Sequence, residues 1–414
     1  MFSLFDIIAI LLALTASFAW FNHVLLGLPN TIGLLLMGLV ASLVLVAVEL
    51  VFPGTAVFRE ASRLVREINL SAPLLNGMLG FLLFAGALHV DFSKLRERKW
   101  IVGVMATFGV FISTLIIGIG FWATALWLGT PIAFAWALVF GALISPTDPV
   151  AVLSTLKEAK LPETLEMDIS GESLFNDGVG VVLFTILLAA ASSGESHFGP
   201  ANFARLFLVE ALGGALLGLA AGYVAYRAMR LIDDYTIVVL ITLALVTATY
   251  AAALRLHVSG PIAVVTAGVL IGNRGAAVAM SETTRRYVYA FWSLIDEILN
   301  SVLFLLIGLV VLVLEFAPAS LPLAFAAIPI VLVARLCAVS IPVFAMRGKT
   351  HFEKNTIAIL TWGGVRGGIS IALALSIVDA PDRSLLLTAT CVVAMFSIVV
   401  QGLTLRPVVQ RLRF

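Results

Sequence analysis

The sequence has few charged residues and little of what metal or redox sites are built from. Only 12% of its 414 residues are charged and 61% are hydrophobic, whereas a soluble domain has about 25% charged residues. The two cysteines, Cys337 and Cys391, both lie in apolar runs and are predicted to be small core residues, not a disulfide or a metal site. The five histidines form no cluster, and a net charge of +1 indicates no general attraction to nucleic acid. These shortages predict a protein that needs no cofactor and does not bind nucleic acid.

Most of the sequence consists of long apolar runs. Windows of about 20 apolar residues, the length that crosses a bilayer as a helix, recur from end to end. The N-terminus lacks the basic region of a signal peptide, so the first run is expected to be retained as a helix. We predict an all-α polytopic membrane protein of about thirteen transmembrane helices, at residues 4–26, 30–51, 74–93, 100–128, 131–156, 167–193, 203–231, 235–254, 260–276, 286–316, 319–346, 354–378 and 384–408.

Lysine and arginine indicate the orientation. An odd number of segments places the two termini on opposite sides of the bilayer. With the N-terminus outside, about 17 of the 25 basic residues fall in inner loops and about 6 in outer loops, as the positive-inside rule requires. Three of the outer residues, Arg59, Arg63 and Arg66, have the spacing of a short amphipathic helix on the membrane surface. We predict a multi-pass protein of the cell membrane with its N-terminus outside and its C-terminus in the cytoplasm.

Two predicted segments contain residues that break a helix. The segment at 131–156 contains Ser145-Pro146-Thr147-Asp148-Pro149, in which the prolines remove backbone donors. The segment at 354–378 contains Gly363-Gly364-Val365-Arg366-Gly367-Gly368, in which glycine makes unwinding easy. Irregular backbone at membrane depth is tolerated only where it is buried in protein or lines a wet cavity.

The two breaks lie in the fifth and the twelfth segments, an odd number of crossings apart, so these segments run in opposite directions. Paired discontinuous helices of this kind are typical of inverted-repeat transporters. Crossed half-helices bring like dipole ends together, and the opposite charges of Asp148 and Arg366 would offset them. Ordinary proline and glycine kinks are the alternative interpretation.

The segment at 167–193 contains a dense group of polar residues, in the run Gly171-Glu172-Ser173-Leu174-Phe175-Asn176-Asp177-Gly178. Glu172 and Asn176 are four residues apart, as are Ser173 and Asp177, so the four share one helix face. Oxygen ligands suit a hard cation, and the lack of nearby His or Cys argues against zinc, copper or iron. The hydroxyl and freed carbonyl of Thr147, with Asp148, are candidates to complete the shell of a small cation.

Asp177 is the residue that we expect to alternate between a cation and a proton. Burial disfavours the charged form of a carboxyl group, so H⁺ and Na⁺ can compete for one acid. Because neither ligand shares the acid with the other, competition is itself an exchange mechanism. Asn176 carries no charge, and a single titrating carboxyl at this pair predicts electroneutral exchange of one H⁺ for one Na⁺ or Li⁺. A structural hydrogen bond to a neighbouring helix is the alternative role for Asp177.

Arg335 lies deep in the apolar segment at 319–346. An unpaired guanidinium there is very costly and cannot deprotonate. Glu172 is the expected partner, in a bidentate pair that ties two segments together. Asp148 is the alternative partner.

At these residues the sequence resembles the sodium/proton antiporters of the NhaP/NHE branch of the cation–proton antiporter superfamily. The matching residues are Thr147-Asp148-Pro149, the run Gly171–Gly178, Phe304-Leu305-Leu306-Ile307-Gly308, Ala334-Arg335 and Gly363-Gly364-Val365-Arg366-Gly367. The resemblance implies an inverted-repeat fold with two crossed discontinuous helices, a homodimer, and an elevator-like movement of a core bundle.

The resemblance also implies a role for each polar residue. The implied Na⁺ ligands are Thr147, Asp148, Ser173 and Asp177. Glu172 would pair with Arg335, and Asn176 would support that pair. Arg366 would stabilise the crossed helices by compensating charge.

The same resemblance implies how the chain is divided. Residues 1–98 and 233–318 would form a dimerisation domain. Residues 99–196 and 319–414 would form the core ion-transport bundle, and residues 197–232 would be a connecting helix.

We therefore expect a secondary active transporter for Na⁺ and H⁺ that serves pH homeostasis, and not an enzyme. K⁺/H⁺ exchange stays open because oxygen ligands do not set the size of the cavity. A passive cation channel is a weaker alternative, since a site buried by alternating access suits exchange better. An intramembrane aspartyl protease would need two aspartates in motifs that surround neither Asp148 nor Asp177.

Overall fold

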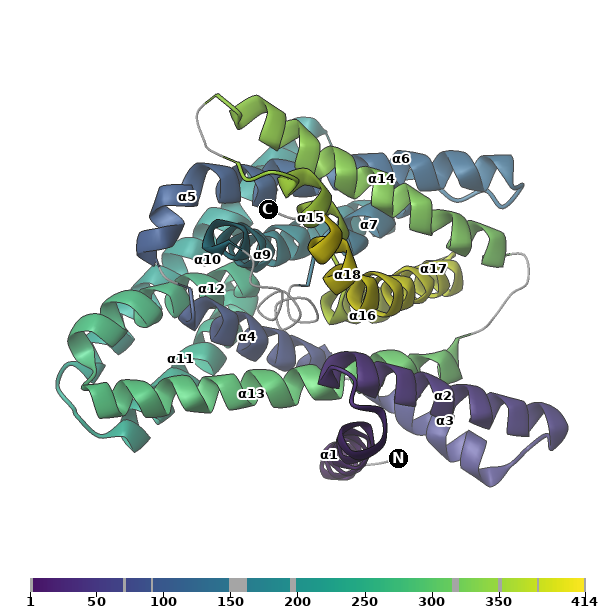
Figure 1. Cartoon of the computed structure of the whole chain (residues 1–414), viewed down its shortest axis with the longest axis horizontal. Helices are drawn as coiled ribbons and strands as arrows, with labels where there is room; N and C mark the ends of the chain where they lie inside the picture. The colour runs from purple at the N-terminus through teal and green to yellow at the C-terminus, as the bar shows by residue number, and fades with distance from the viewer. Residues whose placement is uncertain are drawn as a thin grey trace.

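The computed structural model describes residues 3–69, 72–90, 92–148, 162–193, 199–314, 320–348, 352–377 and 380–412, and the regular elements in these ranges are helices (Figure 1). The first half of the chain forms α1 (Leu4–Phe21), α2 (Asn30–Val51), α3 (Ala56–Asn69), α4 (Ala72–Leu88), α5 (Phe92–Val104), α6 (Val110–Trp127), α7 (Phe134–Ile144) and α9 (Glu163–Ser193). The second half forms α10 (Pro200–Met229), α11 (Tyr235–Leu256), α12 (Gly260–Leu270), α13 (Glu282–Leu309), α14 (Leu321–Met346), α15 (Thr356–Trp362), α16 (Gly368–Leu375), α17 (Arg383–Phe396) and α18 (Gly402–Leu412).

The helices account for the predicted membrane segments. Ten stretches in the described ranges are long and apolar enough to cross a bilayer. Gly77–Leu88 and Phe134–Ile144 are shorter apolar helices, and the pair α15–α16 occupies the predicted segment at 354–378. The predicted all-α fold with discontinuous helices is confirmed. Part of the predicted segment at 131–156 lies outside the described residues.

Several helices continue through π-helical turns. Met105–Gly109 joins α5 to α6, and Ser397–Gln401 joins α17 to α18. The resulting stretches run from Arg96 to Trp127 and from Arg383 to Leu412. The first stretch begins four residues before the predicted segment at 100–128, and the second ends four residues after the predicted segment at 384–408, because these terminal turns carry charged residues.

The short helix predicted around three arginines is α3. Arg59, Arg63 and Arg66 are exposed, while Leu64 and Val65 are buried. Val65 packs in a cluster with Leu305, Leu309 and Leu312, which joins α3 to the end of α13. The helix is therefore amphipathic, with its apolar side against the protein.

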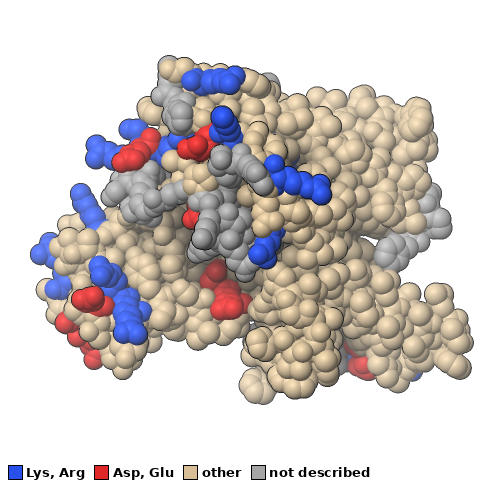
Figure 2. All heavy atoms as spheres, viewed as in Figure 1, with Lys and Arg blue, Asp and Glu red and all other residues tan. Residues whose placement is uncertain are grey.

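The surface is apolar over wide areas. Leu212, Leu216 and Val224 of α10 are 58%, 66% and 68% exposed. On the face shown in Figure 2, Lys and Arg side chains gather around α5 and the end of α14 and on the left side of the view, whereas the surface over α6 carries none. Such a surface is expected where helices contact lipid.

Two layers of helices enclose the centre of the molecule. In Figure 1, α13 and α2 lie along one side and α6 and α14 along the other, with α9 between them. One apolar cluster joins α6, α7, α9, α14 and α17. A second joins α4, α10, α11, α12 and α13. The helix α9 contributes to both clusters and lies where polar side chains from both parts of the chain meet.

The backbones of α2 and α13 touch where the two helices cross. The hydroxyl of Ser42 donates to the carbonyl of Gly308 at 3.0 Å. A Cβ at Gly308 would lie 2.6 Å from the backbone nitrogen of Leu39 and 2.8 Å from the carbonyl carbon of Gly38. Backbone atoms cannot rotate away, so this crossing requires glycine.

Gly308→Ala is therefore expected to lower the free energy of unfolding by about 1–3 kcal/mol through overpacking. The measurement is the melting temperature of the detergent-solubilised protein. Gly103→Ala is the matched control, because Gly103 also lies in a helix but a Cβ there meets nothing within 4 Å. Equal melting temperatures for the two variants would contradict the close crossing.

Candidate functional site

Two stretches of non-helical backbone cross at the centre of the molecule. α7 ends at Ile144, and residues 145–148 continue without helical structure. α15 ends at Trp362 and α16 begins at Gly368. The backbone nitrogen of Asp148 donates to the carbonyl of Val365 at 2.7 Å. The two breaks thus satisfy part of each other's backbone hydrogen bonding, as irregular backbone at membrane depth requires.

Arg366 stabilises this crossing from within. Its guanidinium donates from Nη1 to the carbonyls of Ser145 and Pro146, the latter at 3.0 Å. Its backbone nitrogen donates to the Ser397 hydroxyl at 2.9 Å, and its side chain is 1% exposed. The cation therefore lies at the negative end of α7, where unpaired carbonyls and the helix dipole both favour positive charge.

Asp148 lies beside the N-terminal end of α16, whereas Arg366 lies at the C-terminal end of α7. A Cβ at Gly367 would collide with the Asp148 carboxyl group, so the carboxylate lies directly against the residue that precedes α16. The N-terminus of a helix favours negative charge. The crossing thus places Asp148 by a positive helix end and Arg366 by a negative one. Only glycine at position 367 leaves room for this contact.

Residues of α9 hold the first break in place through Thr147. The Ser173 hydroxyl donates to the Thr147 carbonyl. Asn176 donates from Nδ2 to Thr147 Oγ1 at 2.8 Å and accepts from the Thr147 backbone nitrogen at 3.4 Å. Asn176 therefore contacts the broken stretch, and its expected support of the Glu172–Arg335 pair is not a direct contact. Both polar atoms of the Asn176 amide, Oδ1 and Nδ2, are used in these two hydrogen bonds to Thr147.

Asp177 follows Asn176 on α9 and is 7% exposed. Its carboxyl group lies close enough to that of Asp148 for their charges to interact. Among the residues that the structure describes, none donates a hydrogen bond to the Asp177 carboxyl. Two carboxylates of the same sign in a largely buried place repel each other unless a cation or a proton is present.

Arg335 of α14 pairs with Glu172 and not with Asp148. Nη1 and Nη2 donate to the two carboxylate oxygens of Glu172, the second at 3.0 Å. Nε and Nη2 also donate to the carbonyl of Leu360 in α15, at 3.1 and 2.9 Å. The side chains of Arg335 and Glu172 are 8% and 3% exposed. A buried bidentate pair thus joins α9, α14 and α15.

The sequence alone did not indicate a second ion pair, which joins a buried acid to a half-buried arginine. Arg98 of α5 donates from Nε and Nη2 to the carboxylate of Asp168, the first at 2.8 Å. Asp168 is 1% exposed and lies one turn before Glu172 on α9. The i, i+4 spacing of Asp168 and Glu172 was the available signal. Arg98 lies just before the predicted segment at 100–128, so the sequence alone counts it among the basic residues of an inner loop.

A third acid also lies near the crossing. Asp296 of α13 accepts from Asn300 at 3.1 Å and lies close enough to Asp148 for their charges to interact. Its side chain is half-buried, whereas that of its neighbour Glu297 is exposed. The negative potential at the site thus has a contribution from α13. The spacing of Asp296 and Asn300 was visible in the sequence but did not by itself indicate this position.

The Glu172–Arg335 pair generates a prediction about stability. Arg335→Ala leaves the charge of Glu172 buried without its partner, so the free energy of unfolding should fall by about 3–5 kcal/mol. The double variant Glu172→Leu, Arg335→Met should recover most of that loss, because no buried charge remains. Melting temperatures in detergent measure both effects. The control is Arg286→Ala, at an exposed arginine of α13, and a similar small effect of Arg335→Ala would contradict the assignment.

The sequence matches the family model described as "Sodium/hydrogen exchanger, transmembrane" over residues 10–411. The Na(+)/H(+) antiporter NhaP of Pseudomonas aeruginosa is 47% identical over 412 residues, which cover 98% of this chain and 96% of that protein. The Na(+)/H(+) antiporter NhaH of Halobacillus dabanensis is 36% identical over 394 residues, with 94% and 93% covered.

A solved structure shares the fold. The sodium proton antiporter MjNhaP1 from Methanocaldococcus jannaschii superposes with a TM-score of 0.73 at 19% sequence identity, covering 98% of this chain and 97% of that one. At 19% sequence identity this match indicates only that the two proteins share a fold. Because the family model spans nearly the whole sequence, this chain belongs to the sodium/hydrogen exchanger family.

Proposed function

We propose that this protein is a secondary active transporter that exchanges Na⁺ or Li⁺ for H⁺ across the cell membrane, one for one. The observation that carries the proposal is the pair of neighbouring acids at the crossing of two broken helices, Asp177, which is buried, and Asp148, which is half-buried. It is supported by relatives that are named as Na(+)/H(+) antiporters and that this chain matches over almost their full length.

In this proposal Asp177 carries either the proton or the cation. When it is protonated, the repulsion between Asp177 and Asp148 is removed. When it is ionised, a cation between the two carboxylates removes the repulsion instead. The proton and the cation therefore satisfy the same electrostatic requirement, and each excludes the other.

Thr147 and Ser173 would supply further oxygen ligands to the cation. The Ser173 hydroxyl uses its proton in the bond to the Thr147 carbonyl, so its oxygen lone pairs stay available. Thr147 Oγ1 accepts from Asn176 and is held in a fixed position beside Asp148. Hard alkali cations prefer oxygen ligands of this kind.

We further propose that the site moves with a core bundle against a dimerisation domain. The site residues come from α7, α9 and the α15–α16 break, within the proposed core at residues 99–196 and 319–414. Residues 1–98 and 233–318 would form the homodimer contact, and residues 197–232 would connect the two parts. The Arg98–Asp168 pair ties α5 to α9, so in this proposal α5 moves with the core. The N-terminus would lie outside and the C-terminus in the cytoplasm.

The role of Asp177 is tested in proteoliposomes with an imposed pH gradient. Addition of Na⁺ should collapse the gradient with the wild-type protein, and Asp177→Asn should abolish this flux because the amide cannot carry a proton. The melting temperature of Asp177→Asn should stay near that of the wild type. Glu297→Gln, at an exposed acid of α13, is the matched control and should retain activity. Substantial exchange by Asp177→Asn would contradict the proposed role of Asp177.

Ion selectivity is measured in the same assay by replacing Na⁺ with Li⁺ or K⁺.

Stoichiometry is tested separately. With the membrane potential set by K⁺ and valinomycin, the initial exchange rate should be the same at positive, zero and negative potential, because one positive charge moves each way. Asn176→Asp adds a second titrating group at the site, and exchange by that variant should become sensitive to the potential. A wild-type rate that changes with potential would contradict one-for-one exchange, and Na⁺-dependent charging of the vesicles would indicate a channel.

A further inference from the structure

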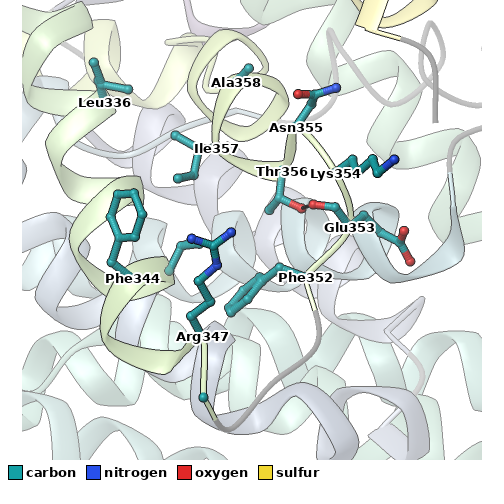
Figure 3. Close-up of a pocket in the computed structure, with 12 residues that line it drawn as sticks. Leu336, Phe344, Arg347, Phe352, Glu353, Lys354, Asn355, Thr356, Ile357 and Ala358 are labelled. Carbon is teal, nitrogen blue, oxygen red and sulfur yellow. Dashed lines mark hydrogen bonds between the residues drawn. The ribbon is translucent and has the colours of Figure 1, made fainter.

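A cavity of about 960 Å³ lies between the end of α14 and the start of α15 (Figure 3). It is separate from the ion site, since no candidate ion ligand is among the described residues that line it. Its walls are largely apolar and include Leu336, Val343, Phe344, Phe352 and Ile357. The cavity opens on the flank of a helix long and apolar enough to cross the membrane.

One charged side chain, the exposed Arg347, borders this apolar space. Figure 3 shows the guanidinium of Arg347 directed into the cavity between Phe344 and Phe352, while the side chains of Lys354 and Glu353 extend outward from its rim. Among the residues that the structure describes, no carboxylate forms an ion pair with Arg347. A guanidinium in such a place is a binding group for an anion, and its planar fork matches a phosphate.

The apolar wall continues from Arg347 along α14 toward the middle of the helix. Leu336, Val343 and Arg347 are seven and then four residues apart, so they lie on one face. The distance from Leu336 to Arg347 is about 16 Å along the helix, at 1.5 Å per residue. Leu336 is 45% exposed and Phe344 is 61% exposed. A ligand with an anionic head at Arg347 and an apolar tail along α14 would cover both kinds of surface.

We propose that this cavity binds an anionic phospholipid of the surrounding leaflet, with its phosphate at Arg347 and an acyl chain against Phe344 and Leu336. A free phosphate would use Arg347 but leave the apolar wall exposed. A neutral lipid would cover the wall without a net charge to match Arg347. Basic pockets beside transmembrane helices commonly bind the anionic headgroups of lipids.

The cavity lies between the two helices, α14 and α15, that also meet at the buried Arg335 side chain. α14 carries Arg335, and α15 carries Leu360, whose carbonyl accepts two hydrogen bonds from Arg335. The lipid would bridge the same two helices a few turns away. Binding is therefore expected to stabilise the contact between α14 and α15.

The test uses the purified full-length chain in a neutral detergent. Binding of dioleoyl phosphatidylglycerol is measured by native mass spectrometry and by the rise in melting temperature, with dioleoyl phosphatidylcholine and inorganic phosphate as comparisons. Phosphatidylglycerol should bind and raise the melting temperature, while the other two should have little effect. Arg347→Gln should weaken phosphatidylglycerol binding by at least about tenfold, since a charge-assisted contact is lost. Phe344→Ala should weaken it as well.

Arg286→Gln removes an exposed arginine from a different helix and should leave binding unchanged. Binding that is unaffected by Arg347→Gln or by Phe344→Ala would overturn the proposal. Equal binding of phosphatidylcholine would overturn it too, because the site would then not select charge. An equal stabilisation by inorganic phosphate would show an ion site and not a lipid site. These readouts do not involve transport, so they stand apart from the test of the exchange mechanism.

Discussion

A buried charge must have an opposite charge or a helix end beside it, and this requirement shapes the centre of the fold. Arg335 meets Glu172, and Arg98 meets Asp168. The guanidinium of Arg366 lies against the carbonyl end of α7. Asp177 lies near a second acid, Asp148, and no side chain among the described residues donates a hydrogen bond to the Asp177 carboxyl group. In the proposed mechanism the proton or the cation balances the charge of Asp177, so the transported ions complete the electrostatics of the site.

Much of this arrangement was predictable because membrane burial limits what a sequence can do. An arginine such as Arg335 in an apolar run needs an acid, and few acids lie in apolar runs, so Glu172 was a strong candidate. The proline and glycine breaks indicated discontinuous helices for a similar reason, since few other residues interrupt a membrane helix. The all-α fold followed from the length and number of the apolar runs.

Contacts that depend on how one helix is turned against another were not predictable. Asn176 reaches Thr147 because α9 presents that side to the break, and nothing in the local sequence sets this rotation. Arg98 and Asp168 are 70 residues apart, and in the sequence each lies at the end of a predicted membrane segment, where a charge is usually solvated. The position of Asp296 near Asp148 depends on the packing of α13, which only the assembled fold defines.

α9 carries Asp168, Glu172, Ser173, Asn176 and Asp177 on a single continuous helix, and each of the first four is bonded to a neighbouring element. The ligands in the proposed site therefore keep their mutual spacing if the bundle shifts as a unit. An ion would then meet the same oxygen atoms whether it arrived from the cytoplasm or from outside. Such a carrier has no built-in preference for direction, and the concentrations of the two ions on either side would alone decide which way net exchange runs.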